Sequence, residues 1–203
     1  DYFEWVATGL EEPMTTHADR FKYNTGYGMS AYDKGSVFLS QLQYVIGKEN
    51  FDNTLKRYFN DWSFKHPKPN DFIRSAEKVS GLELDWYLLD WAQSTMTIDY
   101  SINSIYGVDN KTRVVLKRIG QMGMPIDLRV ELLNGEVLDY NIPMTKMRGS
   151  KPVSSSTILK SWSWAKPYYE LYIDIDSKSI SKITIDPKNE MADINRNNNY
   201  LVL

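Results

Sequence analysis

The spacing of apolar residues changes once along this chain, near residue 95. Upstream, apolar residues recur three and four positions apart, which places them on one face of a helix. Downstream, from Met96, they alternate with polar residues, as is typical of half-buried strands. Because the two patterns follow one another, the sequence predicts an α+β multidomain protein. We expect a helical subdomain at residues 1–95 and an immunoglobulin-like β-sandwich at residues 96–203.

The first part predicts four helices after a less regular lead-in. Ser30 and Asp33 form the S-x-x-D pattern of a capping box, so the first helix should begin at residue 31 and end at Gly47. The second carries a broad apolar stripe and should form an antiparallel pair with the first. Pro69 suits the first turn of the third helix, which should stop at Gly81. The predicted helices cover residues 31–46, 49–64, 69–80 and 84–93.

The second part predicts short strands separated by turns. Asn134-Gly135 lies between two alternating runs and is the dipeptide that a two-residue type I′ hairpin favours, because both residues need a positive φ. Residues 146–157 are rich in Ser, Lys and Gly and are expected to form a surface loop. The polar run 193–199 is expected to be a mobile terminus rather than a calcium loop. The predicted strands are 96–102, 111–119, 126–133, 136–142, 169–175 and 179–186, a density typical of an immunoglobulin-like sandwich.

Charge and composition exclude several function classes. The chain has 24 basic and 26 acidic residues, interspersed, with a formal net charge of −2. It has no basic stripe for phosphates, so nucleic acid is not an expected partner. It has no apolar run of about 20 residues, so no transmembrane segment is expected. The absence of cysteine does not fix a compartment, and an extracytoplasmic location, periplasmic or secreted, is favoured over a cytoplasmic one. The chain opens at Asp1, which suggests a processed chain or a piece of a longer one.

Few residues suggest chemistry by themselves. His17 and His66 are the only histidines and do not fall in a metal-binding spacing such as H-E-x-x-H, so we expect no metal ligands in this chain. Ser-His-Asp catalysis and phosphate-binding loops have no support. The run SWSWAKPYY at residues 161–169 clusters aromatics that could bind a glycan or a peptide, although packing in the core and rim of a sheet is the commoner use.

One long stretch does resemble a known family. Residues 31–91 read AYDKGSVFLSQLQYVIGKENFDNTLKRYFNDWSFKHPKPNDFIRSAEKVSGLELDWYLLDW. This is similar to the sequence that follows the zinc site in M1-family metallopeptidases, the gluzincin aminopeptidases. There, Y-x-K-G precedes an aliphatic helix, an F-x-x-x-L-x-x-Y-F run, a proline break and a tryptophan-rich helix. The resemblance covers residues 27–93, and the positions in register are Tyr32, Lys34, Gly35, Gly47, Phe51, Leu55, Tyr58, Asp71, Phe72, Gly81, Trp86 and Trp91.

The resemblance implies a catalytic role for Tyr32. In the family, the tyrosine of Y-x-K-G donates its hydroxyl to the oxyanion of the tetrahedral intermediate, opposite the zinc. A phenol suits this task because it is a neutral donor at pH 7. We also expect the capped helix start to place the positive end of a helix dipole beside Tyr32. Tyr27 corresponds to a tyrosine near the substrate in some members, which implies a substrate-binding role.

The departures from the family pattern limit this reading. The family's two His and one Glu zinc ligands, its Glu general base and its G-x-M-E-N stretch lie upstream of Y-x-K-G, and none is present here. We therefore expect the chain to be the C-terminal portion of an M1-type peptidase, comprising the end of a thermolysin-like catalytic domain and a β-sandwich. The full-length protein would bind zinc and a peptide substrate. Its missing N-terminal and zinc-binding parts would be partners of this chain. This chain alone should be inactive.

Two alternatives stay open. The chain could be a non-catalytic module that binds protein or glycan through Trp162, Trp164, Tyr168 and Tyr169, or a scaffold relative of M1 peptidases without zinc. The sequence does not decide between exopeptidase and endopeptidase action, side-chain preference or oligomeric state. An apolar helical face left uncovered could also make the chain self-associate.

Overall fold

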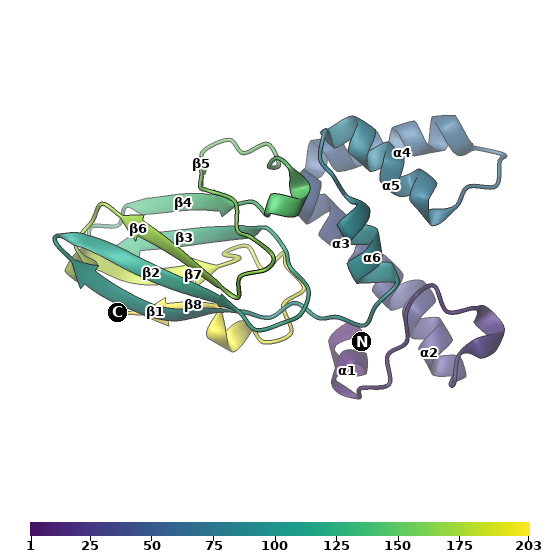
Figure 1. Ribbon diagram of the computed structural model, residues 1–203, viewed down its shortest axis with the longest axis horizontal. Coiled ribbons are helices and arrows are strands. Elements are labelled where there is room, and N and C mark those ends of the chain that lie inside the picture. Colours follow the sequence, from purple (N-terminus) through teal and green to yellow (C-terminus); the bar gives the residue numbers. More distant parts are fainter. The chain divides into compact units, whose positions relative to one another are not determined.

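The computed structural model describes residues 1–203 and divides into two compact units, which Figure 1 shows as ribbons. The helical unit comprises Asp1–Met96 together with Lys146–Lys151. The sandwich unit comprises Thr97–Thr145 and Pro152–Leu203. The expected α+β class is therefore confirmed. No helix in the chain combines the length and the apolar character needed to cross a membrane.

The helical unit contains the four predicted helices and two more. The α-helices are α1 (Tyr2–Ala7), α2 (Asn24–Gly28), α3 (Gly35–Ile46), α4 (Lys48–Trp62), α5 (Pro69–Ser80) and α6 (Asp85–Ala92). A short 3-10 helix, η1 (Ala18–Arg20), lies between α1 and α2, and a π-helix, η2 (Met29–Lys34), connects α2 to α3. Gly47 and Gly81 end α3 and α5 with φ values of 85° and 71°, which glycine adopts without strain. The expectation of an irregular lead-in missed α1 and α2.

The core of the helical unit lies between α3 and α6. Leu42, Val45 and Ile46 of α3 are fully buried. The hydroxyl of Tyr87 on α6 donates to the Phe38 carbonyl at 2.6 Å, and the two rings lie 5.1 Å apart. This bond connects the two helices within the core.

The second helix packs differently from the prediction. Its antiparallel partner is α5, beside it in Figure 1, where the rings of Tyr58 and Phe72 meet edge to face at 5.1 Å. Phe51 is buried, but Leu55 and Phe59 are 41% and 68% exposed. α4 therefore packs more extensively on α5 than on α3, and part of its apolar stripe is uncovered.

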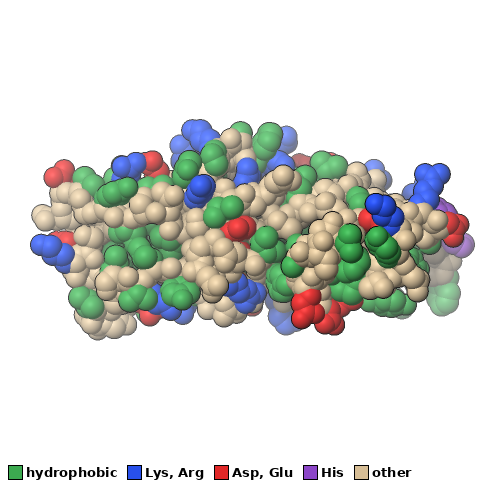
Figure 2. All heavy atoms as spheres, turned by 90° about the horizontal axis from the view of Figure 1, so that it is seen from below, with side chains coloured by type: hydrophobic (Ala, Val, Ile, Leu, Met, Phe, Trp, Pro, Cys, Tyr) green, Lys and Arg blue, Asp and Glu red, His purple; other side chains and the backbone are tan.

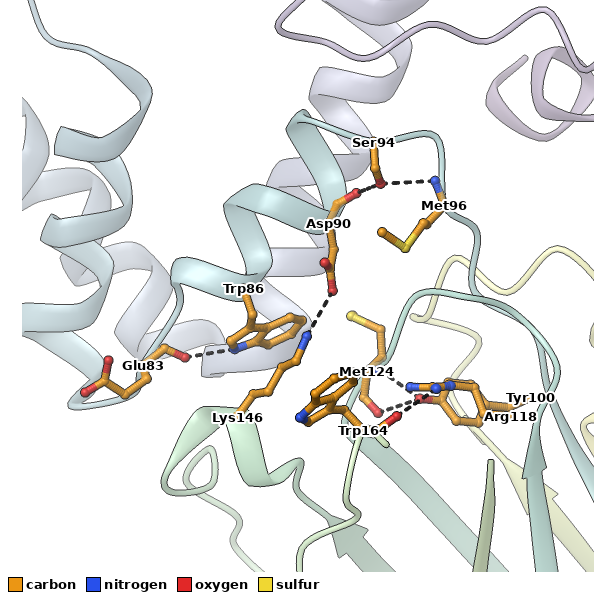
Figure 3. A network of polar contacts seen from close by, with 10 residues as sticks. All are labelled: Glu83, Trp86, Asp90, Ser94, Met96, Tyr100, Arg118, Met124, Lys146 and Trp164. Atoms are coloured by element: carbon orange, nitrogen blue, oxygen red, sulfur yellow. Dashed lines mark hydrogen bonds and ion pairs between the residues drawn. The ribbon is translucent and has the colours of Figure 1, made fainter. Parts of the chain in front are cut away.

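Residues 146–151, expected in a surface loop, instead complete the helical unit. Met147 is fully buried, and its carbonyl accepts a hydrogen bond from the Glu83 N–H at 3.0 Å. Lys146 forms an ion pair with Asp90 of α6 at 3.9 Å (Figure 3). The helical unit therefore depends on a segment from far along the chain.

The sandwich unit consists of two sheets. Its strands are β1 (Tyr100–Val108), β2 (Lys111–Arg118), β3 (Ile126–Leu132), β4 (Val137–Ile142), β5 (Thr157–Ile158), β6 (Tyr168–Ile173), β7 (Ile180–Ile185) and β8 (Tyr200–Val202). One sheet has the order β1-β2-β6 and the other β5-β4-β3-β7-β8. Burial alternates along β3, as the period of two predicts, so the core lies along one face of this strand. The arrangement is that of a β-sandwich-like domain.

The hairpin of β3 and β4 forms as predicted, but its turn differs. Only Gly135 has a positive φ, 87°, and the Leu132 N–H donates to the Glu136 carbonyl at 2.9 Å. The connection is therefore a three-residue turn with glycine in the left-handed position, rather than type I′. The two-residue turn with two positive φ values lies instead at Asp109 and Asn110, between β1 and β2.

Tyr100 and Asp193 form hydrogen bonds inside the sandwich unit. The Tyr100 hydroxyl donates to the Met124 carbonyl at 3.1 Å and accepts from the Met124 N–H at 2.8 Å (Figure 3). Burial raises the pKa of Tyr100 to about 12. Asp193, in the run expected to be mobile, is 2% exposed and accepts from the Tyr100 N–H at 2.9 Å. The C-terminal residues therefore belong to the fold and continue into β8.

Candidate functional site

Tyr32 lies in the π-helix η2 and not in the first turn of a capped helix. The helical run begins at Asn24 and continues through η2 into α3, so Ser30 is an internal residue. Its hydroxyl donates to the Glu12 carbonyl at 3.5 Å instead of capping a helix start. The predicted capping box is wrong, and the helix-dipole argument for Tyr32 fails with it.

The π-helix explains which side chains of this run are buried. Gly26, Ser30, Lys34 and Phe38 are buried and follow one another at intervals of four residues. An α-helix turns by about 100° per residue, so positions four apart drift by about 40° at each step. The wider turns of η2 remove most of this drift, and the four residues stay on one face. Tyr32, two positions from both Ser30 and Lys34, points the other way and is 76% exposed.

Lys34 is the unusual member of the buried face. Its side chain is 2% exposed, and its ammonium lies 2.5 Å from the Glu11 carboxylate, which is 6% exposed. The same ammonium donates to the Ser94 carbonyl at 3.0 Å. A buried cation needs such partners, because an uncompensated charge in an apolar interior costs several kcal/mol. The sequence marked Lys34 through its motif, but Glu11, 23 positions away in a stretch without regular spacing, gave no signal.

Tyr27 lies one segment earlier, in α2, and is 44% exposed. Its ring packs edge to face on Phe21 at 5.7 Å between ring centres. Beside it, Gly26 is buried, and an added Cβ there would lie 3.4 Å from the Trp5 ring. Tyr27 and Tyr32 therefore both expose their phenols from the same helical run, held by contacts on its other face.

The residues of this chain do not fit a zinc site. No group of three or more His, Cys, Asp or Glu side chains is placed where it could hold a metal ion. His17 accepts a hydrogen bond from the Asp19 N–H at 3.3 Å, and both side chains are exposed. Figure 2 shows acidic and basic side chains interspersed with hydrophobic ones on the face that it presents. What the helical unit does offer is an exposed, neutral hydroxyl donor on a buried support.

The helical unit matches a known family. Residues 7–91 match the model of the peptidase family M1 domain. Aminopeptidase N of Escherichia coli (strain K12) is 24% identical over 140 residues, which covers 65% of this chain and 16% of that protein. Aminopeptidase N of Haemophilus influenzae is 23% identical over 111 residues, 55% of this chain and 12% of that protein. The matched region therefore spans less than a fifth of either relative.

A solved structure extends the likeness in fold. The crystal structure of Legionella pneumophila aminopeptidase A in complex with aspartic acid superposes with a TM-score of 0.51 at 16% identity. The superposition covers 83% of this chain and 18% of that chain. The matched residues include the Y-x-K-G motif, in which Tyr32 is exposed and Lys34 is buried. Residues 7–91 of this chain are therefore similar to the peptidase family M1 domain.

Proposed function

We propose that the chain is the C-terminal portion of a zinc-dependent M1-type aminopeptidase that hydrolyses peptide bonds. The observation that carries the proposal is the match of residues 7–91 to the peptidase family M1 domain, which includes the exposed phenol of Tyr32. The relatives named aminopeptidase N support the choice of an aminopeptidase. In this proposal, Tyr27 contacts the substrate and Tyr32 is the catalytic residue.

The task assigned to Tyr32 is to stabilise the tetrahedral intermediate. Its hydroxyl donates a hydrogen bond to the oxyanion, and a neutral donor meets the developing charge without requiring a counter-ion beforehand. A single donor of this kind usually contributes about 10²–10³ in kcat. Its exposure, 76%, leaves the hydroxyl accessible to a substrate carried by other parts of the protein.

Zinc, in this proposal, is held outside these 203 residues and activates the attacking water there. The helical unit supplies the oxyanion donor only. We therefore expect the purified 203-residue chain to cleave no aminoacyl substrate when zinc is added. Zinc-dependent cleavage by this chain alone, removed by a chelator, would contradict that part of the proposal.

The decisive substitution is Tyr32→Phe in the complete, zinc-loaded protein. The proposal predicts that kcat falls by about 10²–10³ with little change in KM, because only a transition-state contact is lost. Tyr23→Phe is the matched control, since Tyr23 lies in the same unit, is 49% exposed and has no assigned role. A Tyr32→Phe enzyme with kcat within about threefold of the parent would refute the role of Tyr32.

A binding module is the second candidate, and one surface favours it. Tyr106, Tyr168 and Tyr172 are each about half exposed on the same face of the β1-β2-β6 sheet, because Arg113 pairs with Tyr106 and Tyr172 in register. Trp162 cannot belong to such a surface, since it is 4% exposed.

The binding candidate is tested on the exposed aromatics. Trp164 and Tyr168 remain from the predicted aromatic set, at 52% and 47% exposure, whereas Tyr169 is partly buried and donates to the Lys160 carbonyl at 2.7 Å. Glycan or peptide binding that is lost in Trp164→Ala and Tyr168→Ala would support this module. A complete protein without a zinc motif would instead indicate a scaffold relative of M1 peptidases.

A further inference from the structure

The second feature of the site is the buried ion pair of Lys34 and Glu11, on the face of η2 opposite Tyr32. Both side chains are almost completely removed from solvent, at 2% and 6% exposure, and the charged atoms are 2.5 Å apart. A buried ion pair contributes little net stability, because the desolvation of both charges offsets their attraction. Its best-attested use is to specify one arrangement of the chain among several.

Three contacts hold the buried face of η2 in one register. Glu11 and Glu12 are consecutive, and they bind Lys34 through the carboxylate and Ser30 through the main-chain carbonyl. Ser94 supplies the third contact, since its carbonyl accepts from the Lys34 ammonium at 3.0 Å. The ion pair is therefore one part of a clamp on the π-helix.

Ser94 is itself fixed in place. Its hydroxyl donates to the Asp90 carbonyl at 2.5 Å and accepts from the Met96 N–H at 3.2 Å, just after the end of α6 (Figure 3). These bonds fix the Ser94 carbonyl, which accepts the hydrogen bond from the Lys34 ammonium. The ammonium is consequently bound between two segments that do not belong to its own helix.

The π-helix needs such a clamp. A π-helix is rare and is less favourable than the α-helix that the same residues could form. If residues 29–34 closed into regular α-helical turns, positions four apart would drift around the axis, and Lys34 would leave its partners. The direction of residue 32 would change with them, because it is set by the same turns.

We infer that Lys34 and Glu11 are positioning residues, which hold η2 in its π-helical register and thereby fix the direction of the Tyr32 phenol. This inference rests on the proposed role of Tyr32 in the reaction. Neither residue touches the substrate. Their effect on turnover passes through Tyr32 alone.

The test replaces the pair by apolar residues of similar volume, Glu11→Leu with Lys34→Met. Such replacements of buried ion pairs are often neutral or stabilising, so the fold should persist. In the complete, zinc-loaded protein, we expect kcat to fall at least about tenfold with KM within about threefold, as for a misdirected catalytic group. In the 203-residue chain, the amides of Met29–Lys34 should exchange at least about tenfold faster, while those of α5 are unchanged.

A double-mutant cycle separates this inference from the proposed function. In a Tyr32→Phe background, the pair replacement should lower kcat by no more than about twofold, since the group it positions is already lost. An equal loss in both backgrounds, or no loss in either, would overturn the positioning role. An unchanged kcat for Tyr32→Phe itself would overturn the proposed function instead.

A second variant serves if the double replacement does not fold. Glu11→Asp keeps the charge that the buried Lys34 requires but shortens the side chain by one methylene group, which loosens the ion pair without leaving an unpaired cation. We expect a smaller loss, about threefold in kcat, that again disappears in the Tyr32→Phe background. The same loss in both backgrounds would contradict the inference.

Discussion

Asp186 is a buried carboxylate at the end of β7, and its titration should control the stability of the sandwich unit. It is 3% exposed and has a φ of 50°. Its two oxygens accept from the N–H groups of Glu190 and Met191 at 3.0 and 2.8 Å. Burial raises the pKa of Asp186 from 3.8 to about 6, with a further contribution from Asp127, against the opposing effect of the two hydrogen bonds and Arg196.

The direction of the pH effect follows from this raised pKa. Between pH 3.8 and 6 the folded state holds the Asp186 proton more tightly than the unfolded state, so the contribution of Asp186 to stability is greatest at low pH and falls as the pH rises. The difference between 3.8 and about 6 corresponds to about 3 kcal/mol of unfolding free energy. Above about pH 7, where Asp186 is ionised in both the folded and the unfolded state, no further change is expected from this group.

The assay compares the parent chain with Asp186→Asn between pH 3.5 and 7.5. Urea unfolding, followed by the NMR signals of β3, reports on the sandwich unit alone, which matters because a chain of two units need not unfold in one step. The unfolding free energy of the parent, minus that of Asp186→Asn, should fall by about 3 kcal/mol across this range. The asparagine lacks one acceptor oxygen, which shifts the variant by a constant amount.

The result that would refute the reasoning is a difference that rises with pH. That outcome would mean that the two backbone hydrogen bonds outweigh burial and hold the pKa of Asp186 below 3.8. Asp127→Asn provides an internal check. Because the charge of Asp127 raises the pKa of Asp186, its removal should move the inflection to lower pH.

Three further predictions test the packing. Tyr100→Phe should lower the free energy of unfolding by about 1–3 kcal/mol, because the main-chain groups of Met124 lose their buried partner. The control, Tyr106→Phe at a half-exposed position, should change it by less than about 0.5 kcal/mol. Thermal unfolding measures both. Met147→Ala should lower the free energy of unfolding of the helical unit, into which this residue packs, by about 2–5 kcal/mol. The NMR signals of that unit report the change. Phe59→Ser should reduce any self-association seen by sedimentation velocity, because this ring is 68% exposed; an unchanged association constant would exclude this face.

The apolar pattern in the sequence predicted where the helices lie better than it predicted which helices pack together. The stops at Gly47 and Gly81 were correct because only glycine adopts their φ values easily. The apolar stripe of α4 was read as one buried face, but Phe59 is exposed and Phe51 is buried. Periodicity identifies an apolar face without saying what covers it, and here part of that face has no cover within the chain.

The type of each hairpin turn was harder to predict, because two-residue and three-residue turns both favour Asn, Asp and Gly. Asn-Gly occurs in the three-residue turn at Gly135, whereas Asp109-Asn110 adopts the two positive φ values that Asn134-Gly135 was expected to have. Turn type and loop length together set the register of a hairpin, and the turn dipeptide alone does not specify the loop length.

The motif marked Tyr32 as the candidate site residue, but the local structure around it differs from the predicted helix start. The motif indicated Tyr32 and Lys34, but S-x-x-D at Ser30 and Asp33 suggested a helix start where the chain forms a π-helix. A local pattern cannot report that Glu11 is brought back to bind Lys34, since that contact depends on the packing of the lead-in.

The central claim is that the Tyr32 phenol stabilises an oxyanion. Its most direct test is the binding of a phosphinic peptide, an analogue of the tetrahedral intermediate, to the complete zinc-loaded protein. Tyr32→Phe should weaken this binding by about the same factor, 10²–10³, by which it lowers kcat/KM, and should leave the binding of the peptide product unchanged. Equal affinities of the parent and Tyr32→Phe for the analogue would contradict the account.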